Sequence, residues 1–487
     1  MMRPPYQQWR LIGFLLALCE AVAAEPQRPN IVLIVSDDHG REALGCYGNP
    51  VIQTPHLDAL AAAGTRFTEA YCTTASCSPS RSVILTGQHS HRNGMYGLQH
   101  DEHHFQSFAQ TRTLPVRLSE VGYRTARVGK FHVAPESIYA FQTVLSPGIA
   151  NDPGAIGRSP VEMVELARDF ISDPDAAPFF LYFATDDPHR SNTIRANGRP
   201  SFETYPQPNP FGNRPEGRPG IKPVVYRAEG VLVPPFLSDT PEARAELAEY
   251  YQAVSRLDQG VGRLIELLKE SGRYESTLII YLSDNGSAFP MAKTTLYDAG
   301  IRLPCIIRVP GSLSPGVVQD AMISWADITP TLLDFAGVSA DSADFDGRSF
   351  RAGIEGQKLE GRNEVYASHN FHGITQYYPV RAIRNRQYKL IYNLESQLAF
   401  PMAPDLLFSP TWIAAIKDPR QKLGRRSLVD FSHRPRFELY DLQQDPDEVT
   451  NLAEDPAHQA ELESLIAKLK SWQRASRDPW FDRWNRN

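Results

Sequence analysis

Three apolar runs of the chain each end in a cluster of polar side chains. The clusters are Asp37 with Asp38, Asp187 with His189, and Asp284 with Asn285. Carboxylate and amide oxygens are hard ligands that suit Ca²⁺ or Mg²⁺ better than zinc. An acidic pair after a strand is more often a turn or a helix cap than a metal ligand. The metal interpretation therefore requires that the clusters lie together in the fold.

A cysteine in a polar stretch is the second chemical feature. Cys77 begins the segment CSPSR, which ends at Arg81 and leads into an apolar, helix-like run. The chain has 5 cysteines, and their spacing matches neither a dense disulfide framework nor a paired zinc motif. Cys77 is an ordinary thiol, a disulfide partner of Cys72, or a chemically special residue.

The elements that must position these residues follow from the apolar pattern. Unbroken runs of β-branched residues predict buried parallel strands. We expect strands within 30–40, 178–190, 277–286 and 303–311, and helices within 54–64, 160–172, 241–272 and 328–337. The segment 113–132 should form a helix, a turn and a strand that delivers Lys130 and His132. This alternation predicts an α/β sandwich around a large mixed, mostly parallel sheet flanked by helices. Positions 191–240 predict a long surface excursion.

A second, smaller domain is expected after about Gly347. Its strand-like segments are 364–369, 379–385 and 388–394. They predict an antiparallel sheet, and 458–476 predicts an amphipathic helix. We therefore expect a catalytic domain at 25–346 and a C-terminal α+β domain at 347–487.

The N-terminus has the three parts of a secretory signal peptide. Arg3 and Arg10 precede the apolar run LIGFLLAL, and small residues follow near Ala24. We expect a signal peptide at 1–24 and a secreted or periplasmic protein. A lipid anchor on Cys19 is the minor alternative, because a bulky leucine precedes it. The apolar run is too short for a stable membrane span.

The bulk composition limits the partners. A formal net charge of −6 gives no reason to expect nucleic-acid binding. No other segment is long and apolar enough to predict a membrane span. The assembly is left open, with a homodimer as one alternative.

The motif from Cys77 to Arg81 resembles the Cys-x-Pro-x-Arg signature of type I sulfatases. A lone match would be weak, but six motifs follow the order of that family. They are NIVLIVSDDHG, CSPSRSVILTG, VGKFH, DDPHR, SDNG and ELYDLQQDPDEVTNLA. The resemblance implies an alkaline-phosphatase-like fold and a sulfated sugar or oligosaccharide as substrate. It also implies that a maturation enzyme converts Cys77 to formylglycine (3-oxoalanine).

The resemblance further implies a role for each candidate residue. One Ca²⁺ would be held by Asp37, Asp38, Asp284, Asn285 and the modified Cys77. Arg81 and Lys130 would orient the hydrated aldehyde, whose first hydroxyl attacks sulfur and whose second expels sulfate. His132 would be the base for sulfate release. His189, helped by Lys293, would protonate the leaving group, and Lys293 with Lys130 would bind the sulfonate oxygens.

Several stretches resemble one branch of the family, the heparan N-sulfatases or sulfamidases. They include HRNGMYGLQHDEHHFQSF, GKFHVAPESIY and YYPVRAIRNRQYKLIYNL. Lys293 replaces an arginine of that branch, which loses bidentate geometry, and Gly373 replaces a glutamate. We expect exo-acting hydrolysis of N-sulfoglucosamine. The main alternative is an O-sulfatase that acts on a polymer of sulfated rhamnose or galactose.

Other interpretations stay open. The chain could be a phosphate- or phosphonate-ester hydrolase of the same superfamily, or a non-catalytic glycan-binding protein on a sulfatase scaffold. Outside the family pattern, Lys130, His132 and His189 would be ordinary structural or solvated residues. The run QHDEHHF, with His100, His103 and His104, could suggest a second metal site. Histidine is a poor ligand for a hard cation, so substrate contact or loop structure is preferred there.

Overall fold

The structure is a computed structural model. It describes residues 28–146, 155–175, 177–191, 193–194, 200–201, 210–311, 315–339 and 343–485. The expected signal peptide and Cys19 lie outside the described residues.

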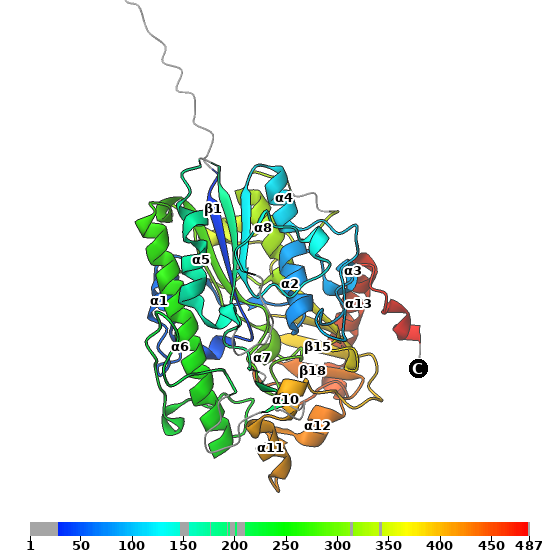
Figure 1. The fold of residues 1–487 in the computed structure, drawn as a ribbon. Coiled ribbons are helices and arrows are strands. Elements are labelled where there is room, and N and C mark those ends of the chain that lie inside the picture. Colours follow the sequence, from blue (N-terminus) through cyan, green and yellow to red (C-terminus); the bar gives the residue numbers. More distant parts are fainter. Residues whose placement is uncertain are drawn as a thin grey trace, which may run out of the picture.

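An eight-stranded sheet forms the centre of the larger part of the molecule (Figure 1). Its strand order is β11-β2-β10-β9-β1-β6-β4-β5. The strands are β1 (Asn30–Ser36), β2 (Thr65–Phe67), β4 (Arg124–Gly129), β5 (Thr143–Val144), β6 (Phe179–Ala184), β9 (Thr277–Ser283), β10 (Cys305–Arg308) and β11 (Val317–Gln319). β1 is parallel to β6 and β9, and β4 is parallel to β6, whereas β10 is antiparallel to β9 and β2. The predicted mixed, mostly parallel sheet is confirmed.

Helices cover both faces of this sheet (Figure 1). The first face is covered by α1 (Pro55–Ala63), α5 (Pro160–Ser172) and α6 (Pro241–Glu270), and the second by α2 (Cys77–Thr86), α4 (Leu114–Glu120) and α8 (Ile328–Phe335). In β1, Val32 and Ile34 pack on the first face, and Leu33 and Val35 pack on the second. Because both faces are covered, every residue of β1 is buried, which explains its unbroken apolar sequence.

The sequence explains both the first and the last residue of the long helix α6. The Thr240 side chain accepts a hydrogen bond from the Ala243 amide, and Pro241 occupies the first turn, where its missing N–H is not needed. The chain leaves the helix after Glu270, and Gly272 takes φ 69°. A positive φ of this kind favours glycine, so Gly272 fixes the end of the helix.

The C-terminal part contains a four-stranded antiparallel sheet of order β13-β14-β15-β18. The strands are β13 (Glu364–Phe371), β14 (Tyr377–Asn385), β15 (Tyr388–Asn393) and β18 (Phe437–Asp441). The helix α13 (Gln459–Ala475) packs on this sheet through Leu462, Leu465 and Leu469. The predicted C-terminal antiparallel sheet and amphipathic helix are both present.

The remaining elements are short. The helices are α3 (Ser90–Asn93), α7 (Asp298–Ile301), α9 (Arg351–Ile354), α10 (Pro404–Leu407), α11 (Pro410–Lys417) and α12 (Leu428–Ser432). The strands are β3 (Ala70–Tyr71), β7 (Thr193–Ile194), β8 (Pro200–Ser201), β12 (Ile323–Ser324), β16 (Lys422–Leu423) and β17 (Arg426–Ser427). Within 191–240, the described residues hold only β7, β8 and a 3-10 turn at Ala228–Gly230, as expected for an excursion.

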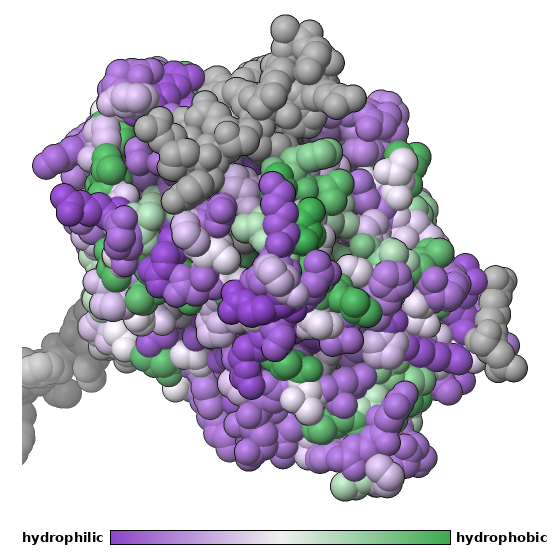
Figure 2. Space-filling view, turned by 90° about the horizontal axis from the view of Figure 1, so that it is seen from below, coloured by the Kyte–Doolittle hydropathy of each residue, from purple (hydrophilic) through white to green (hydrophobic). Residues whose placement is uncertain are grey.

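The face seen in Figure 2 mixes hydrophilic and hydrophobic residues, and the hydrophobic ones lie in small separate groups. Such scattered apolar residues are normal on a globular protein. Among the described residues, no helix combines the length and the apolar character that a membrane crossing requires.

Candidate active site

The parallel pairing of β1 and β9 brings the acidic and amide candidates together. Ser36 lies opposite Ser283, so the residues that follow each strand emerge side by side. The Asp38 amide donates to Asp284 Oδ1 at 3.1 Å, and Asn285 Nδ2 donates to Asp38 Oδ1 at 2.6 Å. Asp38 has φ 61°, a strained left-handed conformation of the kind that persists at functional sites.

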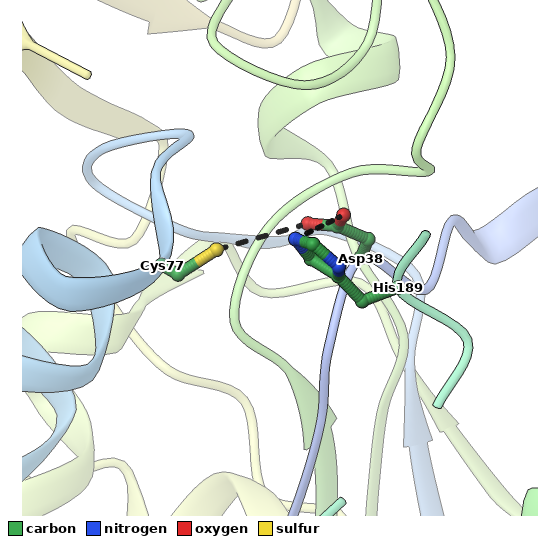
Figure 3. Close-up of side chains that lie close together, drawn as sticks. All are labelled: Asp38, Cys77 and His189. Atoms are coloured by element: carbon green, nitrogen blue, oxygen red, sulfur yellow. Dashed lines mark hydrogen bonds and ion pairs between the residues drawn. The ribbon is translucent and has the colours of Figure 1, made fainter. Parts of the chain in front are cut away.

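Helix α2 brings Cys77 and Arg81 to the same place. Every residue of the helix is buried, and the two side chains, four positions apart, share one helix face. Cys77 Sγ lies 4.0 Å from Asp38 Oδ1, and Figure 3 shows it facing Asp38 and His189. Arg81 Nε donates to Asp284 Oδ2 at 2.8 Å. A cysteine and a buried cation therefore meet the carboxylates at the end of the sheet.

The oxygen atoms around Cys77 fit a hard divalent ion. Two groups of residues each offer ligand atoms within 4.8 Å of one another: Asp37 with Cys77 and Asp284, and Asp38 with Cys77 and His189. Asp37 Oδ1 and Asn285 Oδ1 are buried and have no hydrogen-bond partner among the described residues. Buried acceptors normally have a partner, and a bound cation would supply one. The donor set is rich in oxygen, as Ca²⁺ prefers.

Burial and mutual repulsion perturb the three carboxylates unequally. Burial raises the pKa of Asp284 to about 8, with Arg81 opposing and Asp37 and Asp38 adding to the rise. Burial raises the pKa of Asp38 to about 6. Burial also acts upward on Asp37, but Lys130 and neighbouring positive charges hold the pKa of that carboxyl well below its usual range. Carboxylates this close together favour a nearby cation.

Cys77 is a buried thiol without a disulfide. The cysteines at 46, 72, 77 and 305 are all free, so the alternative of a bridge between Cys72 and Cys77 is wrong. Burial, with the Asp37 carboxylate adding to it, raises the pKa of the Cys77 thiol well above its usual range. An unmodified thiol here stays protonated and is a weak nucleophile.

Two buried lysines flank the carboxylates. Gly129, the last residue of β4, pairs with Ala184 of β6, so Lys130 emerges at the same edge of the sheet and forms an ion pair with Asp37. Lys293 reaches the site from the loop after β9. Its Nζ lies 2.9 Å from Asp38 Oδ2, 2.8 Å from His189 Nε2 and 2.8 Å from Asp405 Oδ2.

His189 is held in one tautomer. Its Nδ1 donates to the Arg190 carbonyl oxygen at 2.5 Å, and its Nε2 accepts from Lys293. Burial and the Lys293 charge hold the pKa of His189 well below its usual range. The mobile proton of this pair is therefore on Lys293.

His132 is a buried, neutral imidazole beside a second histidine. It has φ 57°, and its Nε2 lies 2.5 Å from His100 Nδ1. Burial and the Lys130 charge hold the pKa of His132 well below its usual range. A neutral imidazole can accept a proton, as a general base must.

The remaining sequence candidates lie elsewhere or form no metal group. Asp187 accepts from Arg256 Nε and Nη2, both at 2.7 Å, and so does not join the other strand-end carboxylates. His103 borders the pocket and His104 is exposed. Within the described part of the chain, no metal-binding group of three includes His100, His103 or His104.

A pocket of about 80 Å³ opens at these residues. A single water needs roughly 10–15 Å³ of such space, so a tetrahedral anion has room. The lining residues are Cys77, Leu98, His100, His103, His132, His189, Lys293, His372, Gln376, Pro404 and Asp405. His372, Gln376 and Asp405 were missed by the sequence analysis. They come from the C-terminal part, where no motif marks them.

Comparison with known proteins places this geometry in a family. Residues 29–338 match the model described as Sulfatase, and residues 289–422 match the model described as N-sulphoglucosamine sulphohydrolase, C-terminal. N-sulphoglucosamine sulphohydrolase from Homo sapiens is 38% identical over 96% of this chain and 93% of its own length. An ulvan-active sulfatase from Formosa agariphila is 28% identical over 95% of this chain and 83% of its own length.

Solved structures share the fold. One is the structure of a protein in complex with its substrate, D-glucosamine-2-N,6-O-disulfate. It superposes on this chain with a TM-score of 0.66 at 22% identity, covering 93% of this chain and 99% of that chain. A phosphonate monoester hydrolase of Agrobacterium radiobacter gives a TM-score of 0.64 at 21% identity, covering 92% and 96%. The family match over most of the chain, together with a relative similar over nearly its whole length, shows that the chain belongs to the sulfatase family.

Proposed function

We propose that the protein hydrolyses a sulfate group from a sulfated glycan, and that its preferred substrate is terminal N-sulfoglucosamine, cleaved in an exo fashion. The observation that carries the proposal is the meeting of the strand-end carboxylates and three buried cations around Cys77, which itself lines the pocket. Sulfate esters and sulfamates are anions, so cations must offset their charge before an oxygen nucleophile can approach. Similarity to the human N-sulphoglucosamine sulphohydrolase over 96% of this chain supports the N-sulfo preference.

Two groups would complete this site. One Ca²⁺ would be held by Asp37, Asp38, Asp284, Asn285 and the modified Cys77. The buried Oδ1 atoms of Asp37 and Asn285, which have no hydrogen-bond partner among the described residues, support this assignment. Formylglycine at position 77, when formed and hydrated, supplies an oxygen nucleophile and a second hydroxyl that expels sulfate. An ordinary thiol has no second hydroxyl, which explains why the residue at this position is a cysteine, the side chain that can be converted to formylglycine.

The side chains of the protein bind and orient the reacting groups. Asp284 holds Arg81 and Asp37 holds Lys130, so both cations stay beside residue 77. Lys130 and Lys293 bind the sulfonate oxygens as point charges. His132, neutral in its buried position, takes a proton when sulfate leaves.

Protonation of the leaving group is assigned to Lys293 and His189 together. Lys293 donates to His189 Nε2 at 2.8 Å, so a proton can move from the ammonium group onto Nε2 and from Nε2 to the leaving atom, which leaves the lysine neutral. A sugar nitrogen or oxygen is a poor leaving group, and its departure needs a proton in the transition state. The pair therefore supplies the acid in this mechanism.

Assays on protein with a characterised Cys77 peptide test the proposal. Mass spectrometry should find the aldehyde or its hydrate at position 77 in active preparations. Among N-sulfoglucosamine and a panel of O-sulfated sugars, we expect the highest kcat/KM on N-sulfoglucosamine. An unmodified thiol in fully active protein would exclude the mechanism. A preference for an O-sulfated sugar would exclude only the N-sulfo assignment.

One feature of the pocket favours a second candidate, an O-sulfatase on another sulfated polysaccharide. A Cβ atom on Gly373 would lie 2.5 Å from Gln376 Oε1 and 2.7 Å from His103 Cε1. Gln376 and His103 thus fill the space of the glutamate expected there from the N-sulfatase branch. This wall would contact the sugar, so polymers of sulfated rhamnose or galactose belong in the assay panel.

A phosphate- or phosphonate-ester hydrolase is separated from a sulfatase by relative rates. We expect aryl sulfate to be hydrolysed faster than aryl phosphate, and the reverse ratio would reassign the reaction.

We also propose that the protein is exported, with cleavage near Ala24, and that a maturation enzyme modifies Cys77. N-terminal sequencing of the exported protein should begin near residue 25.

A further inference from the structure

Asp405 places a carboxylate in the pocket that we propose binds the sulfate group. It is the second residue of α10, and its side chain is 7% exposed. Among the described residues that line the pocket, it is the only carboxylate. A negative charge that faces an anionic substrate opposes binding, so its position requires a reason.

Lys293 contacts both Asp405 and His189, and Lys293 and His189 are the pair proposed to protonate the leaving atom. An ammonium group has three donors, and Lys293 directs them to Asp405, to Asp38 and to His189. Asp405 is therefore separated from the His189 imidazole by one ammonium group. A leaving atom that hydrogen-bonds to that imidazole would share the pocket with Asp405, which lines it together with His189 and Lys293.

The two substrate classes leave different charges at this place. Hydrolysis of a sulfamate breaks the S–N bond: R–NH–SO₃⁻ + H₂O → R–NH₃⁺ + SO₄²⁻. The nitrogen gains both protons of the water and becomes a cation. Hydrolysis of a sulfate ester breaks the S–O bond, R–O–SO₃⁻ + H₂O → R–OH + SO₄²⁻ + H⁺, and the sugar oxygen stays neutral. A carboxylate stabilises an ammonium group much more than a hydroxyl group.

We propose that Asp405 is a specificity-determining residue whose carboxylate receives the ammonium group formed on the sugar as the S–N bond breaks. This inference rests on the proposed N-sulfoglucosamine activity and names the residue that favours a sulfamate over a sulfate ester. The N-sulfatase branch has a glutamate where this chain has Gly373, which carries no carboxylate. In this protein a different segment, α10, supplies a carboxylate to the pocket through Asp405.

Binding of the product sugar to an inactive protein tests the inference without turnover. Cys77→Ala protein, with and without Asp405→Asn, is titrated calorimetrically at mildly acidic pH with glucosamine, a cation, and with N-acetylglucosamine, which is neutral. We expect Asp405→Asn to weaken glucosamine binding by roughly tenfold to a hundredfold, as for a charge-assisted hydrogen bond, and to change N-acetylglucosamine binding little. Equal weakening of both sugars, or no weakening of either, overturns the inference.

Two further variants exclude a general effect of the substitution. Asp405→Glu keeps the charge and should recover part of the glucosamine affinity. Asp430→Asn removes an exposed carboxylate of the same part of the chain and should leave both affinities unchanged. Thermal unfolding of each variant confirms that the binding data come from folded protein.

Turnover distinguishes failure of this inference from failure of the proposed function. If the wild-type enzyme hydrolyses N-sulfoglucosamine, the function stands, and Asp405→Asn should lower kcat/KM for that substrate far more than for an aryl sulfate. An equal loss on both substrates would mean that Asp405 only positions Lys293, which overturns the inference and leaves the function intact. A wild-type enzyme that hydrolyses only sulfate esters overturns the N-sulfo preference itself, and the inference with it.

Discussion

Arg81 and Asp284 form an ion pair that is completely buried between α2 and the end of β9. Arg81 Nε and Nη2 each lie 2.8 Å from Asp284 Oδ2, and neither side chain is exposed. Removing one partner of such a pair leaves an uncompensated buried charge, which typically costs about 3–5 kcal/mol. The pair also holds the guanidinium beside Cys77. Stability and catalysis therefore depend on the same contact.

Arg81→Ala should lower the free energy of unfolding by about 3–5 kcal/mol and abolish turnover. Denaturant titration and a sulfatase assay measure the two effects. Arg112 is the matched control, because its ion pair with Glu120 is half exposed at both ends. Arg112→Ala should cost less than about 1 kcal/mol. Equal losses of stability for the two variants would contradict the structural role of Arg81.

Removal of calcium should destabilise the folded protein. Asp37, Asp38 and Asp284 lie close together, and without a divalent ion the positive charges that relieve their mutual repulsion are those of Arg81, Lys130 and Lys293. We expect a chelator to lower the melting temperature, added Ca²⁺ to restore it, and metal analysis to find one ion per chain. Asn285→Ala should raise the Ca²⁺ concentration needed for restoration. A melting temperature that does not respond to chelation would reject the metal site.

Cys77→Ala and Cys77→Ser should both fold and both lack turnover. The thiol lies among buried atoms but has no disulfide, so a small replacement disturbs the packing little. Serine offers one hydroxyl, whereas the proposed nucleophile needs two on the same carbon. Circular dichroism and thermal unfolding check the fold, and a discontinuous sulfate assay checks turnover. Multiple turnovers by either variant would remove Cys77 from the nucleophile assignment.

The strand-end residues show what the sequence can predict about the site. Asp37, Asp38 and Asp284 were expected together because unbroken apolar runs predict parallel strands, and such strands end at one edge of a sheet. Asp187 follows a strand in the same way, yet its carboxylate turns to Arg256 of α6. The direction of a side chain depends on tertiary partners, which no local pattern contains.

Asp405 shows where prediction from the sequence stops. Its partner Lys293 is 112 positions away, and neither residue belongs to an element with a periodic pattern that would bring them together. The short strands β2, β5 and β11, at or next to the edges of the sheet, were missed for a related reason. Each has only two or three residues, too few to show alternation.

Replacement of His189 tests the assignment of the leaving-group acid. His189→Ala removes the imidazole that accepts from Lys293 and leaves the ammonium group in place. Loss of a general acid lowers rates by roughly 10²–10⁴ where the leaving group needs a proton, and much less where it departs as a stable anion. We therefore expect a large loss of kcat on a sugar sulfate or sulfamate and a small loss on an activated aryl sulfate. His433→Ala, which removes an exposed histidine, should change neither rate. Equal losses on both substrates for His189→Ala would show that His189 is not the leaving-group acid. It would then act at an earlier step, as a ligand or as a support for Lys293.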